Sequence, residues 1–426
     1  MVRVIVVGGG WAGASAALAA ARAGAEVVLL EKTDQLLGAG LVGGIFRNNG
    51  RFTAAEEAIA LGGGEPFFIM DSAARHKDIS FPGHRHASLY DVTRVEPLMR
   101  TLLQEAGVEV LLQTRVTGVR VKEGLVSGVI SEEGYLFTGQ AFVDCTGTSG
   151  PMGNCLRYGH GCVMCIQRCP AFGPRVSLVD RVGVKEMAAE KREGFYGAMS
   201  GSGELSRESL DPAVLEHLDQ DGIYEVSLPP RLVKGNKLAA KACQQYALPD
   251  YAEKLILLDT GHVKVMTPFL PLEELRTLPG FERARYIDPY AGTRGNSVRF
   301  TAIAPRDNSL LVRGTANLFC AGEKAGVFVG HTEAVVTGLL AGHNAVRWAL
   351  GLKLLELPRE TAIGDFIAHF NDELERGEAL KKSYTFSGSV YFARMQAMGL
   401  YTTDREAIAR RIAALGLTGI LSQRLN

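Results

Sequence analysis

Apolar and polar positions near the start of the chain form a succession of distinct segments. Residues 3–7 read Arg-Val-Ile-Val-Val, and such a continuous β-branched run is typical of a strand buried on both faces of a parallel sheet. A glycine-rich turn follows, and residues 14–23 then form an alanine-rich run that predicts a helix. Residues 25–30 form a second apolar run. This order predicts a strand–helix–strand unit and therefore an α/β fold.

The turn between the first strand and the helix carries the glycine spacing of a dinucleotide-binding fingerprint. Gly8 permits the tight turn, Gly10 lets the backbone approach a pyrophosphate, and Gly13 lets the helix pack on the strand. The N-terminus of the helix offers N–H groups and a positive dipole end to phosphates. Glu31 ends the second strand, where a carboxylate accepts hydrogen bonds from ribose hydroxyls. The residues predicted to hold the cofactor in this unit are Gly8, Gly10, Trp11, Ala12, Gly13, Glu31 and Lys32.

Two later segments repeat the pattern of an apolar strand that runs into a glycine turn. Residues 141–147 end in Thr-Gly, and residues 317–323 end in Ala-Gly-Glu. A long helix of small residues is predicted from 332 to 349. The other elements predicted in this part are a helix at 94–106, a strand at 108–112 and a β-meander at 116–121, 125–130 and 135–137.

This arrangement resembles the flavoproteins that have two dinucleotide-binding folds. The resemblance implies that the cofactor is FAD, and that the turn at 321–323 and the helix after it cover the ribityl chain and the flavin pyrimidine. The positive end of that helix dipole favours negative charge on reduced flavin. His331 precedes the helix and is a candidate for contact with the ring. Further residues expected to lie against FAD are Gly40, Val116, Thr146, Gly147, Gly322, Glu323 and Thr332.

The order of these segments predicts a discontinuous domain organisation. Residues 1–150 and 305–350 are expected to form a Rossmann-type FAD-binding domain. Residues 151–304 are expected to form an inserted α+β substrate domain that opens with a cysteine-rich loop, and residues 351–426 a helical C-terminal cap. The chain shows no separate NAD(P)H fingerprint, so direct use of a nicotinamide is not expected.

Several segments are similar to one narrower family, the glucose-inhibited division protein A group of tRNA-modifying flavoproteins. Residues 1–147 carry this resemblance, and three later blocks resemble its folate-dependent tRNA uridine methyltransferase branch. These blocks are 317–323, 338–345 and 357–364. The methyltransferase branch attacks RNA with a cysteine in its central region, but the matching stretch here, 264–274, has no cysteine. Without a thiolate the covalent mechanism lacks its nucleophile, so RNA modification stands only as the alternative.

Four of the seven cysteines fall within fifteen residues, at Cys155, Cys162, Cys165 and Cys169, and a proline follows the last one. The final part, C-x2-C-x3-C-P, matches the tail of a bacterial iron–sulfur run, which makes a [4Fe–4S] cluster the leading interpretation. A redox dithiol of Cys162 and Cys165 that exchanges electrons with flavin is the second. Tetrahedral zinc and four unligated thiols are the other two.

A polar stretch between the second strand and the helix at 94–106 contains His84 and His86. Inserts at this place reach the substrate side of the flavin in proteins of similar architecture, and histidines titrate near neutral pH. We therefore expect these two histidines, together with Cys162 and Cys165, to be the catalytic side chains.

Charge and composition narrow the function classes. The 426 residues include 46 Lys+Arg and 46 Asp+Glu, which disfavours a globally basic nucleic-acid binder. The last 46 residues hold seven Lys+Arg against two Asp+Glu, an excess that helical surface charge explains better than RNA binding. Only residues 4–21 resemble a membrane or signal segment, and three consecutive glycines make them a poor spanning helix.

The sequence thus predicts a cytoplasmic FAD-dependent oxidoreductase with a cysteine-rich loop near the flavin. Its expected partner is a small-molecule substrate or an electron-transfer protein, with no membrane partner and with the oligomeric state left open. The alternatives are an FAD- and folate-dependent RNA-modifying enzyme and a non-catalytic redox sensor.

Overall fold

A five-stranded parallel sheet forms the centre of the computed structural model, which describes residues 2–147, 169–192, 195–196, 198–200, 203–241, 243–287 and 297–425. The strand order is β21-β10-β1-β2-β6, and all four pairings are parallel. Val4, Ile5 and Val6 in the central strand are fully buried, as the β-branched run predicts. The strands are β1 (Arg3–Val7), β2 (Glu26–Leu30), β6 (Glu109–Leu111), β10 (Ala141–Asp144) and β21 (Leu318–Cys320).

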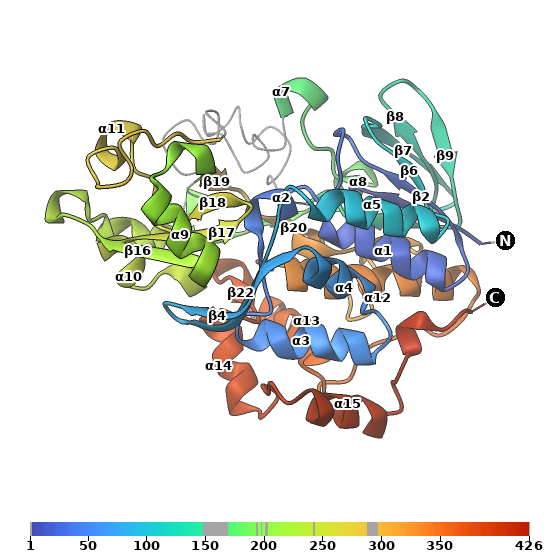
Figure 1. Ribbon diagram of the computed structural model, residues 1–426. Coiled ribbons are helices and arrows are strands. Elements are labelled where there is room, and N and C mark those ends of the chain that lie inside the picture. Colours follow the sequence, from blue (N-terminus) through green and yellow to red (C-terminus); the bar gives the residue numbers. More distant parts are fainter. Residues whose placement is uncertain are drawn as a thin grey trace.

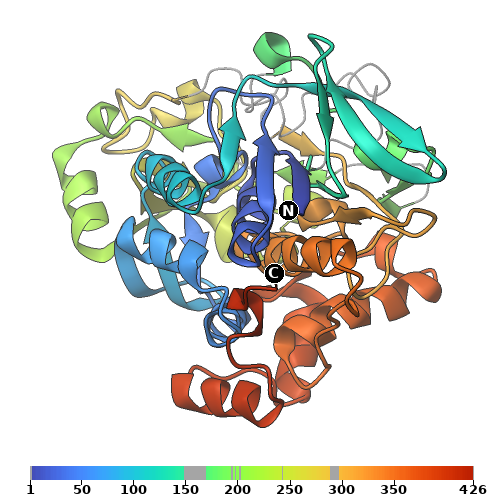
Figure 2. The same ribbon diagram turned by 90° about the vertical axis from the view of Figure 1, so that its right-hand side faces the viewer.

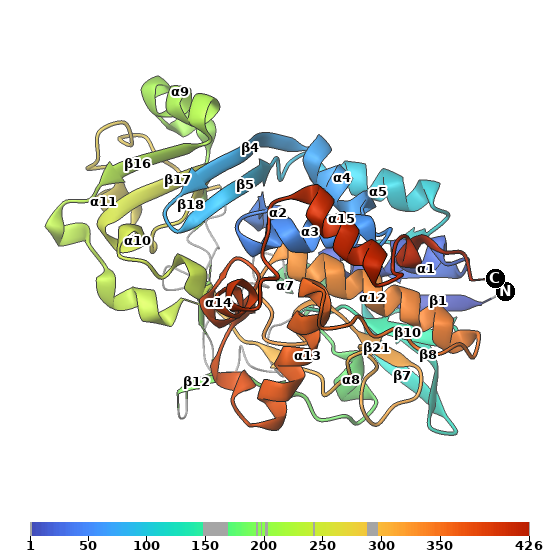
Figure 3. The ribbon, with the colours of Figure 1, turned by 90° about the horizontal axis from the view of Figure 1, so that it is seen from below.

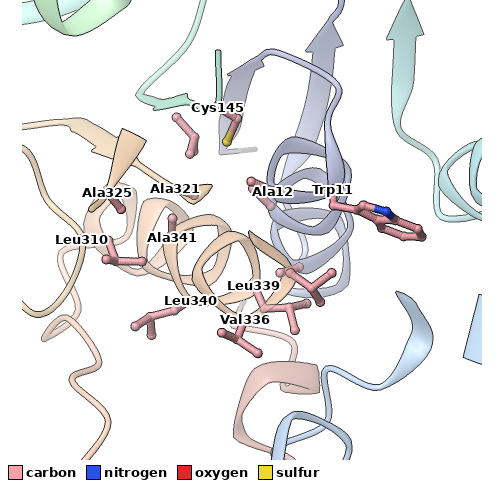
Figure 4. Close-up of a cluster of buried hydrophobic side chains, with 14 of the residues drawn as sticks. Trp11, Ala12, Cys145, Leu310, Ala321, Ala325, Val336, Leu339, Leu340 and Ala341 are labelled. Atoms are coloured by element: carbon pink, nitrogen blue, oxygen red, sulfur yellow. The ribbon is translucent and has the colours of Figure 1, made fainter. Parts of the chain in front are cut away.

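Two helices built from small residues pack closely beneath this sheet. A Cβ placed on Gly338 would lie 2.2 Å from the backbone oxygen of Ala12, and one on Gly342 would lie 2.0 Å from that of Ala16. Only glycine therefore allows the two helices to approach this closely. Figure 4 shows Ala12 at the contact, while Trp11 points away from it. The helices against the sheet are α1 (Trp11–Arg22), α5 (Val95–Glu105) and α12 (His331–Ala349).

The β-meander predicted from the sequence is present and lies above the sheet in the view of Figure 1. Val116, Val126 and Val129 join the main core from its inner face. The meander consists of β7 (Val116–Lys122), β8 (Leu125–Ser131) and β9 (Leu136–Thr138).

A second small sheet, of order β3-β5-β4, leaves the central domain as a long hairpin. Its apolar face packs against the inserted part of the chain, where Phe81 and Leu89 share a cluster with Tyr251 and Ile256. This contact between two regions that the sequence separates was not predicted. The elements here are α2 (Gly40–Gly43), β3 (Ile45–Phe46), α3 (Gly50–Ala60), α4 (Glu65–Ser72), β4 (Ala74–Phe81) and β5 (His84–Tyr90).

The inserted region is built on an antiparallel sheet of order β15-β18-β17-β16, at the left of Figure 1. Its own core contains Leu205, Leu218, Leu257 and Phe281. The elements are β15 (Glu204–Leu205), η2 (Arg207–Ser209), α9 (Pro212–Asp221), β16 (Ile223–Ser227), η3 (Pro230–Leu232), η4 (Gly235–Ala240), η5 (Gln244–Tyr246), α10 (Asp250–Glu253), β17 (Lys254–Thr260), β18 (His262–Val265) and α11 (Leu272–Leu275).

Short elements connect the inserted region to the central sheet through two-stranded pairings, β11 with β20, β12 with β13 and β14 with β19. They are α7 (Cys169–Phe172), α8 (Leu178–Arg181), β11 (Met187–Ala188), β12 (Glu190–Arg192), β13 (Phe195–Tyr196), β14 (Ala198–Ser200), β19 (Ser297–Arg299), β20 (Ala302–Ile303) and η6 (Gly322–Lys324).

The C-terminal region is mostly helical, as predicted, and α15 lies against α3 (Figure 3). The chain then returns to its start, where the N–H of Leu425 donates to the oxygen of Ala23 at 3.0 Å, and the two ends lie near each other (Figure 2). The elements are α13 (Ala362–Glu375), η7 (Ala379–Lys381), β22 (Tyr384–Thr385), α14 (Ser389–Ala397), α15 (Arg405–Ala414) and η8 (Ile420–Ser422).

The Rossmann-type α/β fold expected from the sequence is confirmed, whereas the domain boundaries stay a prediction. Among the described residues, no helix is long and apolar enough to cross a membrane.

Candidate functional site

A cavity of about 620 Å³ opens where the carboxyl ends of the parallel strands meet. Val7, Leu30, Cys145 and Ala321 line it, and each lies at or just after the end of one strand. Ligands of open α/β sheets bind at this edge. The opposite wall comes from the inserted region.

The first turn of the fold fits a dinucleotide. Gly8 has φ +98° and its N–H donates to the oxygen of Leu30 at 2.8 Å. A Cβ on Gly8 would lie 2.4 Å from the oxygen of Cys145, and one on Gly13 would lie 1.7 Å from the oxygen of Gly8. Gly10 lines the cavity, and apart from its chain neighbours no described residue has an atom within 4 Å of a Cβ built on it. The backbone at Gly10 is therefore open to a close-lying pyrophosphate.

Glu31 is held in place beside this turn. Its Oε2 accepts from the N–H of Gly9 at 2.7 Å, and its Oε1 accepts from the N–H of Thr33 at 2.8 Å. A carboxylate oxygen has two lone pairs, so each oxygen can still accept a ribose hydroxyl. The carboxylate lines the cavity, as the ribose-binding prediction requires.

A hydrogen-bond network joins α1, α2 and the start of α12 around the buried Tyr90 hydroxyl. Tyr90 donates to the oxygen of Gly40 at 2.6 Å, and Trp11 Nε1 donates to Tyr90 at 3.1 Å. His331 Nδ1 lies 3.0 Å from the same hydroxyl. Because the single tyrosine proton goes to Gly40, Nδ1 of His331 carries the proton of this contact.

A buried ion pair fixes the first turn of α12 at the cavity. Arg51 Nε lies 3.1 Å from both carboxylate oxygens of Glu333, and Arg51 also donates to the oxygen of Val329 at 2.8 Å. Burial opposes the charge of the guanidinium, but Glu333 raises its pKa above the usual value. Arg51 itself lines the cavity, and Glu333 balances its charge there.

The wall from the inserted region is rich in polar side chains. Lys241 Nζ donates to the oxygens of Tyr246 and Met266, both at 3.0 Å, and lies 4.8 Å from the ring centre of Tyr251. Burial lowers the pKa of Lys241 to about 8, so this ammonium exchanges protons near neutral pH. The side chains of this wall are Glu204, Lys241, Cys243, Gln245, Tyr246, His262, Lys264, Val265, Met266 and Ile287.

Most of the residues predicted to hold FAD line the cavity, and their contact with the cofactor stays a prediction. Gly13 and Thr332 do not line it: Gly13 packs behind the turn, and Thr332 is fully buried as the second residue of α12. His331, the weaker candidate, lines the wall instead. The predicted residues that do line it are Gly8, Gly10, Trp11, Ala12, Glu31, Lys32, Gly40, Val116, Thr146, Gly147, Gly322 and Glu323.

The two candidate catalytic histidines lie in strand β5 rather than in a loop. His84 is buried, with Nδ1 3.0 Å from Asn48 Nδ2 and Nε2 3.1 Å from the oxygen of Gln245. Burial lowers the pKa of His84 to about 3, which keeps the ring neutral. His86 pairs with Asp78 at 2.9 Å near the end of the hairpin. Neither ring lines the cavity, so their acid–base role stays a prediction.

The cysteine cluster falls largely outside the described residues. Cys155, Cys162 and Cys165 lie in the undescribed range 148–168, and nothing is described of the side chain of Cys169, the first residue of α7. Within the described part of the chain, no three His, Cys, Asp or Glu residues gather as a metal site. The [4Fe–4S], zinc and dithiol interpretations therefore stay predictions.

Comparison with known proteins identifies the family. Residues 3–227 and 258–353 match the family model described as glucose inhibited division protein A. The chain belongs to this family. A relative from Thermus thermophilus, named tRNA uridine 5-carboxymethylaminomethyl modification enzyme MnmG, is 28% identical over an alignment that covers 87% of this chain and 69% of the relative.

Solved structures of the same family share the fold. GidA of Aquifex aeolicus in one crystal form has a TM-score of 0.69 and 18% identity, covering 99% of this chain and 74% of that chain. A second crystal form gives a TM-score of 0.67 over the same share of this chain and 76% of the other. The suspected resemblance to the glucose-inhibited division protein A group is thus confirmed.

Proposed function

We propose that this chain is an FAD-dependent enzyme that modifies a uridine of tRNA. The observation that carries the proposal is the family match, which spans both the glycine turn and the strand ends that line the cavity. The relative with 28% identity is named for modification of a tRNA uridine. This support favours the RNA-modifying alternative over the flavin–cluster oxidoreductase that the sequence placed first.

FAD would be held by the turn at residues 8–13, by Glu31 and by the strand ends around Thr146 and Gly322. When bound it supplies electrons or hydride, which the protein side chains lack. The chain itself would orient the cofactor, and the N-terminal turn of α12, held by the Arg51–Glu333 pair, would direct its positive dipole end to the cavity.

The proposed reaction on RNA does not use the cysteine nucleophile of the methyltransferase branch. Lys264, Val265 and Met266 of the matching stretch line the cavity, as a nucleophile-bearing segment should, but no cysteine lies in the stretch. We therefore do not carry the covalent uridine mechanism over to this chain.

The proposal is tested with the FAD-loaded protein and an unmodified tRNA transcript. The protein is incubated anaerobically with dithionite and methylenetetrahydrofolate, and the nucleosides are analysed by mass spectrometry. Binding of the transcript is measured at 50 and 200 mM salt, and we expect affinity to fall as salt rises because phosphate contacts release counterions. A protein that neither binds nor changes the transcript contradicts the proposal. Gly13→Val, which drives a side chain into the oxygen of Gly8, is expected to abolish both FAD binding and modification.

Electron exchange between the cysteine-rich segment and the flavin is a second candidate, favoured by the position of its flanking residues. Gly147 before the segment and Arg175 after it both line the cavity. Lys32, also on the wall, donates to the oxygen of Gly173 at 3.2 Å. Iron, sulfide and zinc analysis of anaerobically purified protein tests this: about four irons per chain support a cluster. If the protein contains no metal, the redox dithiol is the interpretation still to be tested. The variant Cys162→Ser removes this dithiol and must then change the rate of flavin reduction.

A further inference from the structure

One buried side chain of the cavity wall holds an acceptor without a donor. Gln245 is 7% exposed, lines the cavity and receives no hydrogen bond at Oε1 from any described residue. Buried polar atoms are paired in folded proteins, and leaving one unpaired is costly. A ligand that enters the cavity with an N–H or O–H group would supply the missing donor.

The Gln245 side chain has little freedom to seek a partner elsewhere. His84 Nε2 contacts the Gln245 backbone oxygen at 3.1 Å, which anchors this residue to strand β5. A Cβ on Gly388 would lie 2.4 Å from Gln245 Cβ, so the loop before α14 closes tightly behind it. The backbone and Cβ of Gln245 are therefore held at the wall before any ligand arrives.

The charges around Gln245 restrict the kind of donor. The Lys241 ammonium lies on the same wall and contacts the oxygen of Tyr246, the residue next to Gln245. Arg51 also lines the cavity, but Glu333 balances its charge. The nearby ammonium of Lys241 disfavours an amine ligand at Gln245 and favours a neutral N–H flanked by carbonyl oxygens. A glutamine amide carries a donor beside its acceptor, so it pairs with a –C(=O)–N–H– group through two parallel hydrogen bonds.

We propose that Gln245 binds the imide edge, O=C–N(H)–C=O, of a pyrimidine ring, with Lys241 stabilising the carbonyl oxygens of that edge. Two rings in the proposed function carry this edge, the flavin pyrimidine of FAD and the uracil of the substrate. The inference rests on the proposed function for the identity of these rings. The inference adds which residues of this chain recognise these rings. Methylation at N3 removes the hydrogen that the ring would donate to Gln245, so methylating each ring in turn shows which of the two is bound.

The test compares binding of two ligand pairs to the purified full chain. FAD is compared with N3-methyl-FAD on the apoprotein, and uridine 5′-monophosphate with its 3-methyl counterpart on the FAD-loaded protein. We expect about tenfold tighter binding of the unmethylated member in one pair. Discrimination in the FAD pair assigns the edge to the flavin, and discrimination in the uridine pair assigns it to the nucleobase.

Gln245→Met, which keeps the length of the side chain, should abolish this discrimination, whereas Gln244→Met should leave it intact. Gln244 belongs to the same 3₁₀ turn, but its amide donates to the oxygen of Lys241 and does not line the cavity. The inference is overturned if wild-type protein discriminates in neither pair or if Gln245→Met discriminates like wild type. If the protein binds FAD but discriminates in neither pair, only this inference is overturned. A protein that binds no FAD overturns the proposed function, and the uridine pair is then measured on the apoprotein.

Discussion

Glu57 shows how a single buried carboxylate can join three helices. It lies in α3 and is fully buried, and its two oxygens accept from the N–H groups of Ala362 and Ile363 at 2.9 and 3.0 Å. These groups belong to the first turn of α13, where a negative charge complements the helix dipole. Arg411 of α15 contacts the same carboxylate at 3.3 Å. Burial nevertheless dominates and raises the pKa of Glu57 to about 7.

This raised pKa predicts a pH dependence of stability. The folded state binds the Glu57 proton up to about pH 7, whereas the unfolded chain releases it near pH 4.5, so stability is lost as pH rises through this window. The shift corresponds to about 3 kcal/mol. Urea unfolding at pH 5 and pH 8 should show this loss in wild type and a smaller one in Glu57→Gln. Glu56→Gln keeps Glu57 and should keep the loss. Equal pH profiles for wild type and Glu57→Gln would contradict the prediction.

At the scale of elements, the contact between α1 and α12 sets the geometry of the cofactor side. The N-terminus of α1 meets the pyrophosphate turn, and the N-terminus of α12 carries His331 and Glu333 to the cavity. Their close approach at Gly338 and Gly342 therefore fixes the distance between two parts of the site. Figure 4 shows the small side chain of Ala12 at this contact.

Gly342→Ala is expected to destabilise the protein, although alanine ordinarily stabilises a helix relative to glycine by about 1 kcal/mol. Its Cβ would lie 2.0 Å from the oxygen of Ala16, and overpacking of this kind costs about 1–3 kcal/mol. Urea unfolding should show the loss, and FAD affinity should fall with it. Gly235→Ala, where no atom lies within 4 Å of the added Cβ, is the control and should be neutral. A stabilised Gly342→Ala protein would show that the two helices separate easily.

At the scale of the whole molecule, a buried charge cluster holds the inserted region against the hairpin of β4 and β5. Asp259 of β17 accepts from Arg75 Nε at 2.7 Å and His76 Nε2 at 2.8 Å, both in β4. Its other oxygen accepts from Arg207 at 2.8 Å. Burial acts to raise the pKa of Asp259, but the bonds from His76 and Arg75 hold it below the usual value.

Asp259→Asn should therefore loosen the inserted region. Removing one partner of a fully buried ion pair costs about 3–5 kcal/mol, and the cost here is expected to be smaller because Arg75 and Arg207 are partly exposed and still pair with Asp219. Hydrogen exchange should speed up in β4 and β17, and the stability from Asp259 should vanish in wild type as pH falls through its lowered pKa. Asp219→Asn removes an exposed member of the same cluster and should cost less than about 1 kcal/mol. Similar exchange in both variants would argue against this role for Asp259.

The sequence by itself determined the central sheet, the glycine turn and most of the residues that line one side of the cavity. These features depend on short-range patterns: a β-branched run, three glycines at fixed spacing and a carboxylate at the end of the next strand. The helix α12 was also predictable, because its small residues form one continuous segment of the sequence. The family resemblance extended this to FAD and to RNA modification as an alternative.

Only the tertiary structure decided which side chains face the cofactor wall from across the cavity. Gln245 lies in the three-residue 3₁₀ helix η5 and Lys241 lies between η4 and η5, and segments this short carry no periodic signal. The contact of Tyr90 with His331 joins residues 241 positions apart. The sequence placed His84 in a polar insert, but the structure buries it in β5. It is buried because the apolar positions of that hairpin pack against the inserted sheet. Such placements depend on long-range packing, which local sequence patterns do not encode.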